Sequence, residues 1–222
     1  MKELPRFGRT YEPYEIVADS VVHGVGIILA FVGVAVLILS ASGWASPGEI
    51  TAAWIYGLGL LVCLSISFVY NIWPDTPTKW MLRRFDHSAI FVLIAATYTP
   101  FLQRGLDEPV IIVMLAMIWL AAIGGILLKC LFPGRYDRLA ILLYLAMGWS
   151  GVFVAIPLSR YLPSITLWLI VGGGTLYSLG VIFHVWERLR FQNAIWHAFV
   201  VAASAVLYGA VLSCFSLSPP GF

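Results

Sequence analysis

The chain alternates between long apolar runs and short polar breaks along its whole length. Seven runs of 19 to 25 residues stand out, at about 18–42, 50–72, 86–104, 109–132, 138–158, 163–185 and 193–217. An α-helix needs about 20 residues to cross the roughly 30 Å hydrocarbon core of a bilayer. The pattern therefore predicts an all-α, polytopic membrane protein in which seven transmembrane helices form one bundle.

The breaks between the runs contain the residues that interrupt helices, as in "SASGWASPGE" and "WPDTPTKWMLRR". Gly and Pro are the strongest local signals for turns and helix ends. Because every break is short, none is long enough to hold a separate soluble domain. Residues 1–222 are therefore predicted to form a single seven-transmembrane domain.

Composition supports lipid as the solvent of this chain. Hydrophobic residues make up 61% and charged residues 11% of the 222 positions, whereas a soluble domain has about 45–50% and about 25%. The basic residues form short clusters between the runs, which argues against a nucleic-acid partner. The three cysteines lie in three different runs, so we predict neither a disulfide framework nor a thiolate zinc site.

Lys and Arg are distributed unevenly between the two sides of the predicted bundle. Eleven of the thirteen lie in the N-terminal tail or in the second, fourth and sixth breaks, and only Arg104 and Arg160 lie on the opposite side. Lys and Arg accumulate in cytoplasmic loops of membrane proteins. We therefore predict that the N-terminus is cytoplasmic and that the C-terminus lies outside.

Polar residues within the runs gather on the predicted cytoplasmic side. Three runs each carry a polar pair spaced four residues apart, namely Asp19 with His23, Ser67 with Asn71, and Asn193 with His197. Residues at this spacing share one face of a helix. Ionisable groups inside a membrane are costly and indicate function by default. We expect the three pairs and Asp86 to form a ring, because such rings build metal or substrate sites in helical bundles.

Structural roles also fit these residues. Asp19 and Asp86 stand near the predicted starts of their helices, where Asp is favoured as an N-cap. Asn71 and Asn193 are suited to hydrogen bonds between membrane helices, and His23 could bond a neighbouring helix in the same way. His87, next to Asp86, is expected at the membrane interface.

Three segments resemble the bacterial haemolysin III proteins. They are "ADSVVHGVG", "FDHSAIFVLIAATYTPF" and "NAIWHAFVVAASAV". That family belongs with the progestin and adipoQ receptors, which include the adiponectin receptors. The resemblance covers nearly the whole chain, and it implies a multi-pass protein of the bacterial inner (plasma) membrane.

The resemblance also implies a zinc site at the cytoplasmic end of the bundle. In the family the ligands are histidines of a Ser-x3-His and a His-x3-His motif, and an aspartate supports a metal-bound water for hydrolysis of a lipid amide. Ser67, Asp86 and His197 stand at matching positions of this chain. Asn71 and Asn193 stand where the other two ligand histidines are expected.

Those two asparagines change the chemistry of the implied site. Zinc prefers imidazole and thiolate ligands, whereas an amide oxygen suits calcium or magnesium. We therefore expect that the chain has lost zinc and uses no cofactor. The open alternative is that zinc is retained, with His23 or His87 compensating for the lost ligands.

Three functions remain open on these grounds. The first is a metal-free membrane protein whose polar site binds a membrane lipid or senses the membrane. The second is a metal-dependent lipid amidase, similar to a ceramidase, in which Asp86 and Ser67 would be the catalytic residues and Asp86 the general base. The third is the cytolysin or pore that the family name suggests. The oligomeric state is not predicted.

Overall fold

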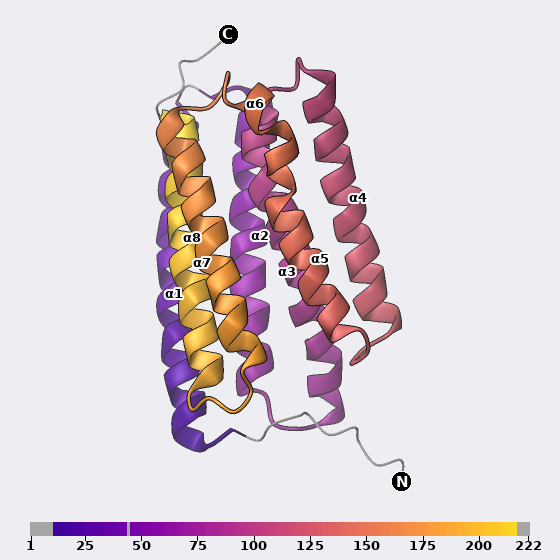
Figure 1. The fold of residues 1–222 in the computed structure, drawn as a ribbon. Coiled ribbons are helices and arrows are strands. Elements are labelled where there is room, and N and C mark those ends of the chain that lie inside the picture. The colour runs from indigo at the N-terminus through magenta and orange to yellow at the C-terminus, as the bar shows by residue number, and fades with distance from the viewer. Residues whose placement is uncertain (1–10, 44, 217–222) are drawn as a thin grey trace.

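The computed structural model describes residues 11–43 and 45–216 as a bundle of helices that run up and down (Figure 1). In chain order the elements are α1 (Pro13–Ala41), α2 (Pro47–Ile72), α3 (Pro77–Gln103), α4 (Pro109–Leu131), α5 (Asp137–Trp149), the 3-10 helix η1 (Ser150–Val154), α6 (Ala155–Leu158), α7 (Ser164–Val185) and α8 (Gln192–Ser216). With α5 to α6 taken as one span, seven are long and apolar enough to cross a membrane. The prediction of an all-α protein with seven spans is confirmed.

Proline marks the start of each of the first four helices. Its fixed φ suits the first turn, and its missing N–H would have no partner there in any case. Helices α1 and α3 begin at Pro13 and Pro77, earlier than the predicted 18 and 86, because hydrophobicity marks the entry into lipid and not the helix start.

The N-caps of α1 and α3 are Glu12 and Thr76. The N-cap alternative for Asp19 and Asp86 is therefore wrong.

The fifth span is interrupted, whereas its sequence predicted one continuous helix. The α-helix gives way to η1 at Ser150. The Tyr98 hydroxyl on α3 donates to the carbonyl of Gly148 and accepts from the N–H of Gly151, both at 2.8 Å. These bonds satisfy backbone groups at the break, as the apolar surroundings of a membrane span require.

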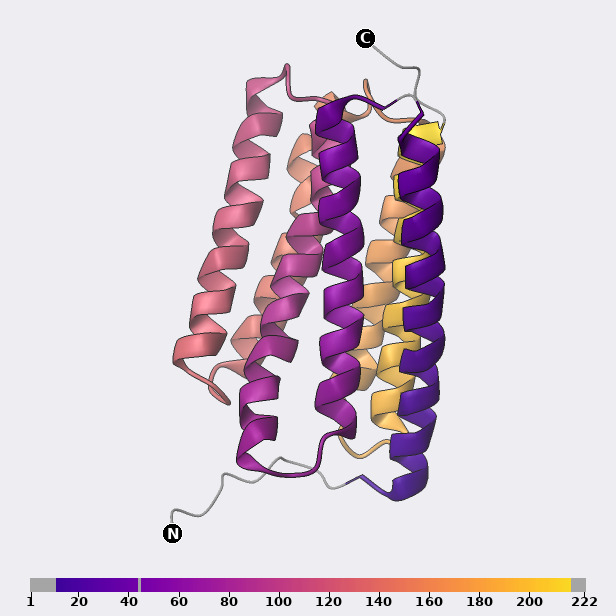
Figure 2. The same ribbon diagram turned by 180° about the vertical axis from the view of Figure 1, so that it is seen from behind.

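The first and last spans lie side by side (Figures 1 and 2). Helix α1 packs against both α2 and α8, α8 also packs along α7, and α3 packs against α2 and α4. This arrangement brings residues from opposite ends of the chain into contact. The start of α1 and the end of α8 lie at opposite ends of the bundle, as seven spans require (Figure 1). Which end faces the cytoplasm stays a prediction.

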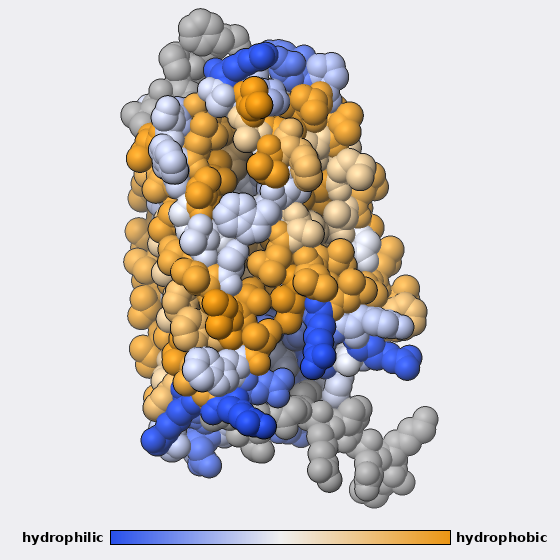
Figure 3. Space-filling view, viewed as in Figure 1, coloured by the Kyte–Doolittle hydropathy of each residue, from blue (hydrophilic) through white to orange (hydrophobic). Residues whose placement is uncertain are grey.

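On the face seen in Figure 3, apolar side chains predominate between two hydrophilic ends. Leu39, Phe153 and Trp168 are 74%, 82% and 72% exposed. Large apolar side chains at such exposure over a continuous belt indicate lipid rather than water as the surrounding solvent. The interior of the bundle is closed by apolar residues such as Leu37, Tyr56 and Val211, each at most 1% exposed.

Candidate functional site

Six polar side chains from three helices meet near one end of the bundle. We call them the polar cluster: Asp19 and His23 from α1, Ser67 and Asn71 from α2, and Asn193 and His197 from α8. Each helix contributes an i, i+4 pair, so its two side chains lie on one face a turn apart. Packing of α1 between α2 and α8 turns the three faces toward one another.

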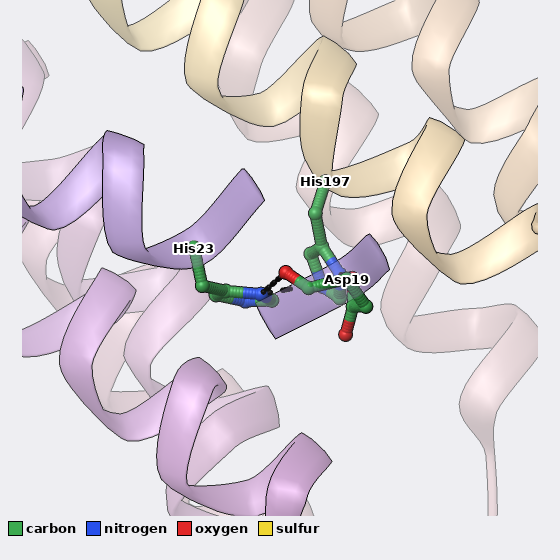
Figure 4. Close-up of side chains that lie close together, drawn as sticks. All are labelled: Asp19, His23 and His197. Atoms are coloured by element: carbon green, nitrogen blue, oxygen red, sulfur yellow. Dashed lines mark hydrogen bonds and ion pairs between the residues drawn. The ribbon is translucent and has the colours of Figure 1, made fainter. Parts of the chain in front are cut away.

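Asp19 is the central acid of the polar cluster, and it orients both histidines (Figure 4). Its carboxylate Oδ1 lies 2.6 Å from His197 Nδ1. Its backbone carbonyl lies 3.0 Å from His23 Nδ1, one turn further along α1. Because a carbonyl and a carboxylate accept hydrogen bonds, the proton of each neutral ring lies on Nδ1. The Nε2 atom of each ring then carries a lone pair.

Both Nε2 lone pairs face the same hydroxyl. His23 Nε2 and His197 Nε2 lie 3.2 Å and 3.4 Å from Ser67 Oγ, and the two ring centroids are 4.1 Å apart. A serine hydroxyl has one proton and can donate to only one of them. The polar cluster therefore contains at least one imidazole acceptor that its own hydroxyl cannot satisfy.

The two asparagines bond to each other and to the rest of the cluster. Asn193 Nδ2 donates to Asn71 Oδ1 at 2.7 Å and to Asp19 Oδ2 at 3.1 Å. Asn71 Nδ2 in turn donates to the backbone carbonyl of Ser67 at 2.8 Å. The amide oxygen of Asn71 is thus directed at another amide and not at the space between the histidines.

Burial differs across the polar cluster. Asp19, His23 and His197 are 3%, 1% and 7% exposed, whereas Ser67, Asn71 and Asn193 are half-buried. A buried carboxylate is stable only when it is paired or hydrogen-bonded, and Asp19 accepts bonds from both His197 and Asn193. The cluster therefore has a closed side at α1 and a more open side at α2.

Asp86 lies beside the polar cluster rather than at its centre. It is close enough to Ser67 to interact with the hydroxyl, and its Oδ2 lies 3.3 Å from Nδ1 of His87. Asn193 donates to Asp19, a member of the predicted pairs, and not to Asp86, which was expected to complete the ring. His87 was expected at the interface, and it is half-buried against Asp86.

Two buried charged residues that were not among the predicted site residues also hold the helices together. Glu15 is 2% exposed and accepts a hydrogen bond from the N–H of Phe191 at 2.8 Å, which ties α1 to the start of α8. Lys129 is also 2% exposed. The four-residue spacing of Glu15, Asp19 and His23 is a sequence signal for Glu15. Lys129 has no such signal, because it stands next to a basic loop and resembles a loop charge.

The arrangement of donors can be compared with what zinc requires. Ligand atoms of Asp19, His23 and His197 lie within 4.8 Å of one another. However, both rings turn Nδ1 toward Asp19 and Nε2 toward Ser67, so the three residues do not direct lone pairs at one point. Zinc sites normally have three or four converging protein ligands. Of these donors, only the two imidazole Nε2 atoms converge, and the point they share is occupied by Ser67 Oγ.

Comparison with known proteins gives consistent matches over most of the chain. A sequence model of a family described as "Haemolysin-III related" matches residues 15–208. The chain is 38% identical to a hemolysin-3 homolog of Bacillus subtilis (strain 168) over 199 residues, which is 89% of this chain and 93% of that protein. Hemolysin-3 of Bacillus cereus is 37% identical over 198 residues, 89% and 90% of the two chains.

A mammalian protein matches over a still larger share of the chain. The human monocyte to macrophage differentiation factor is 34% identical over 227 aligned positions, covering 98% of this chain and 92% of that protein. The similarity therefore includes all seven spans and the three helices that build the polar cluster.

Proposed function

This chain is a multi-pass bacterial inner-membrane protein of the haemolysin-III-related family, and from that premise we propose that its polar cluster binds a membrane lipid without zinc. The lipid would present a hydroxyl or amide N–H to the cluster from the half-buried α2 side. In this proposal the cluster is a hydrogen-bonding site and not a metal centre.

The observation that carries this proposal is the unequal number of donors and acceptors around Ser67. Two imidazole lone pairs face one hydroxyl proton, and the Asp86 carboxylate competes for the same proton. A buried acceptor without a donor costs about 1–3 kcal/mol. A ligand that brings one O–H or N–H would remove that cost. An ester oxygen or a choline group has no such proton and would leave it in place.

The hydrogen bond between Asn193 and Asn71 supports a site that works without zinc. At 2.7 Å, it takes one of the two lone pairs of the Asn71 amide oxygen and directs that oxygen toward Asn193. The same bond joins α2 to α8, so the asparagines hold the helices together where metal coordination would otherwise do so.

Lipid retention on purified protein tests the proposal. Native mass spectrometry of the detergent-solubilised protein would compare a lipid bearing a free hydroxyl and a secondary amide with its O- and N-methylated analogue. We expect the first to be retained several-fold better. Ser67→Ala removes the hydroxyl donor of the cluster, so the ratio in which the two lipids are retained should change. Ser65→Ala, two residues away on α2, is the control and should leave this ratio unchanged. Equal retention of both lipids by the native protein would refute the proposal.

A second candidate, the metal-dependent lipid amidase, is favoured by one observation only. Two imidazole Nε2 atoms face the same point, with Asp86 close by. Metal content by mass spectrometry separates the candidates. We expect the native chain to hold no stoichiometric zinc after equilibration, and the Asn71→His/Asn193→His variant to hold about one zinc per chain. Stoichiometric zinc in the native protein, lost in His23→Gln, would favour the amidase instead.

A further inference from the structure

A second polar site lies at the same end of the bundle, between α3, α4 and the connection to α5. It is a small cleft that we call the basic cleft, lined by Arg83, Arg84, His87, Lys129, Pro133, Gly134 and Asp137. Three of its side chains are cations and one is an acid, so it carries an excess of two positive charges with His87 neutral. Asp86, which contacts His87, is not among the lining residues.

The charge excess is partly buried. Lys129 is 2% exposed, and its ammonium contacts Asp137 Oδ1 and the backbone carbonyl of Arg135, the latter at 3.4 Å. Arg83 Nη2 donates to the other carboxylate oxygen of Asp137 at 2.8 Å. A buried ammonium needs a partner of opposite charge. One carboxylate serves two cations here, and a further anion would complete the pairing.

The connection between α4 and α5 packs closely against one side of the cleft. Gly134 has φ +71, and a Cβ there would lie 2.9 Å from the Trp80 ring and 3.0 Å from Arg83 Nη1. The Arg83 guanidinium also lies over the Trp80 ring, 5.3 Å from its centroid. Only a glycine lets the connection approach so closely. Arg83 and Lys129 are therefore positioned before any ligand arrives.

The cleft lies at the depth of lipid headgroups. Hydrophilic side chains gather at this end of the molecule, below the apolar belt (Figure 3). Phe132 and Tyr136 in the connection are 43% and 53% exposed, as expected for aromatic residues at a membrane interface. Leu131 and Leu142, on α4 and α5, are 67% and 63% exposed. Acyl chains would contact these leucines while a headgroup sits among the cations.

We propose that the basic cleft binds the phosphodiester headgroup of an anionic membrane lipid. Arginine presents a planar fork of N–H groups that matches phosphate oxygens, and lysine adds a point charge. Basic pockets between helices on the cytoplasmic side are suited to anionic headgroups. Arg84 is exposed at the cleft and, among the described residues, is not part of the ion pairs that hold Asp137, so it can turn to a ligand.

Native mass spectrometry of the full-length protein in detergent tests this site with phosphatidylglycerol and phosphatidylcholine as probes. We expect one phosphatidylglycerol to be retained in preference to phosphatidylcholine. Arg84→Gln should reduce that preference about fivefold, the effect of one basic residue near a membrane surface. The matched control is Arg188→Gln, an exposed arginine in the connection between α7 and α8 at the same end, which should leave the preference intact.

Three results would overturn the assignment. Equal retention of the two lipids by the native protein would remove the basis for an anion site. If Arg84→Gln and Arg188→Gln reduce the preference for phosphatidylglycerol equally, the positive charge of the whole surface attracts the lipid and the cleft is not a specific site. Displacement of phosphatidylglycerol by inorganic phosphate, but not by chloride at the same ionic strength, would assign the cleft to a soluble phosphate. Neither Arg84 nor Arg188 belongs to the polar cluster, so these outcomes are independent of the lipid proposed there.

Discussion

His197 Nδ1 and Asp19 Oδ1 lie 2.6 Å apart, although 178 positions separate the two residues in the chain. The contact joins the last span to the first, and it is buried on both sides. Asp19 thereby fixes the ring of His197 so that Nε2 faces Ser67. One carboxylate thus sets both the packing of α1 on α8 and the hydrogen-bonding character of the polar cluster.

Asp19→Asn should destabilise the protein. The carboxylate accepts from His197 and Asn193, and an amide has one oxygen in place of two and adds two donors. Leaving a buried donor unpaired costs about 1–3 kcal/mol, so the unfolding midpoint in detergent should fall clearly. The control is Asp75→Asn, whose exposed i, i+4 pair with Lys79 is worth less than about 1 kcal/mol. Equal effects of the two variants would contradict the central role of Asp19.

Gly125→Ala should loosen the contact between α3 and α4. A Cβ at this position would lie 2.4 Å from the ring of Phe91, which is completely buried. Overpacking of this kind costs about 1–3 kcal/mol. Gly124→Ala, one residue earlier, meets nothing within 4 Å and should be neutral or slightly stabilising. Thermal unfolding of the two variants in the same detergent would check the contrast, and equal midpoints would contradict it.

Tyr98→Phe should destabilise the break in the fifth span. The variant removes the hydroxyl that bonds Gly148 and Gly151. Unpaired backbone groups at this depth have no water to replace it, so we expect a loss of about 1–2 kcal/mol. Hydrogen exchange at residues 148–152 should also accelerate. Tyr136→Phe, at an exposed position of the α4–α5 connection, is the control that should leave both measurements unchanged.

The predicted orientation can be checked with single cysteines. In a Cys130→Ala background, where the remaining Cys63 and Cys214 are buried, an Arg160→Cys variant should react with a membrane-impermeant thiol reagent in intact cells. Arg188→Cys should react only after the membrane is permeabilised, because basic loops stay in the cytoplasm. The reverse labelling pattern would place the polar cluster and the basic cleft on the outer side.

The sequence by itself determined the seven spans. Transfer of apolar side chains into lipid depends on each segment's own composition, so the predicted runs agree with the helices in most places. The exceptions are helices that continue beyond the apolar run, as α3 does from Pro77, and the fifth span, which breaks at Ser150. The three i, i+4 pairs could also be read directly, because residues four apart share a face of any α-helix. The two asparagines stand at expected ligand positions only through the resemblance of their segments to the haemolysin III proteins.

Only the tertiary structure decided how those faces meet. Asp19 and Asp86 are alike in sequence, each an acid close to a histidine near the start of a run. Packing of α1 between α2 and α8 places Asp19 against His197, and Asp86 pairs with its neighbour His87. Likewise, Lys129 and Arg83 share Asp137 because α3, α4 and α5 converge. Such contacts depend on interhelical geometry between distant segments, which no local pattern of hydrophobicity encodes.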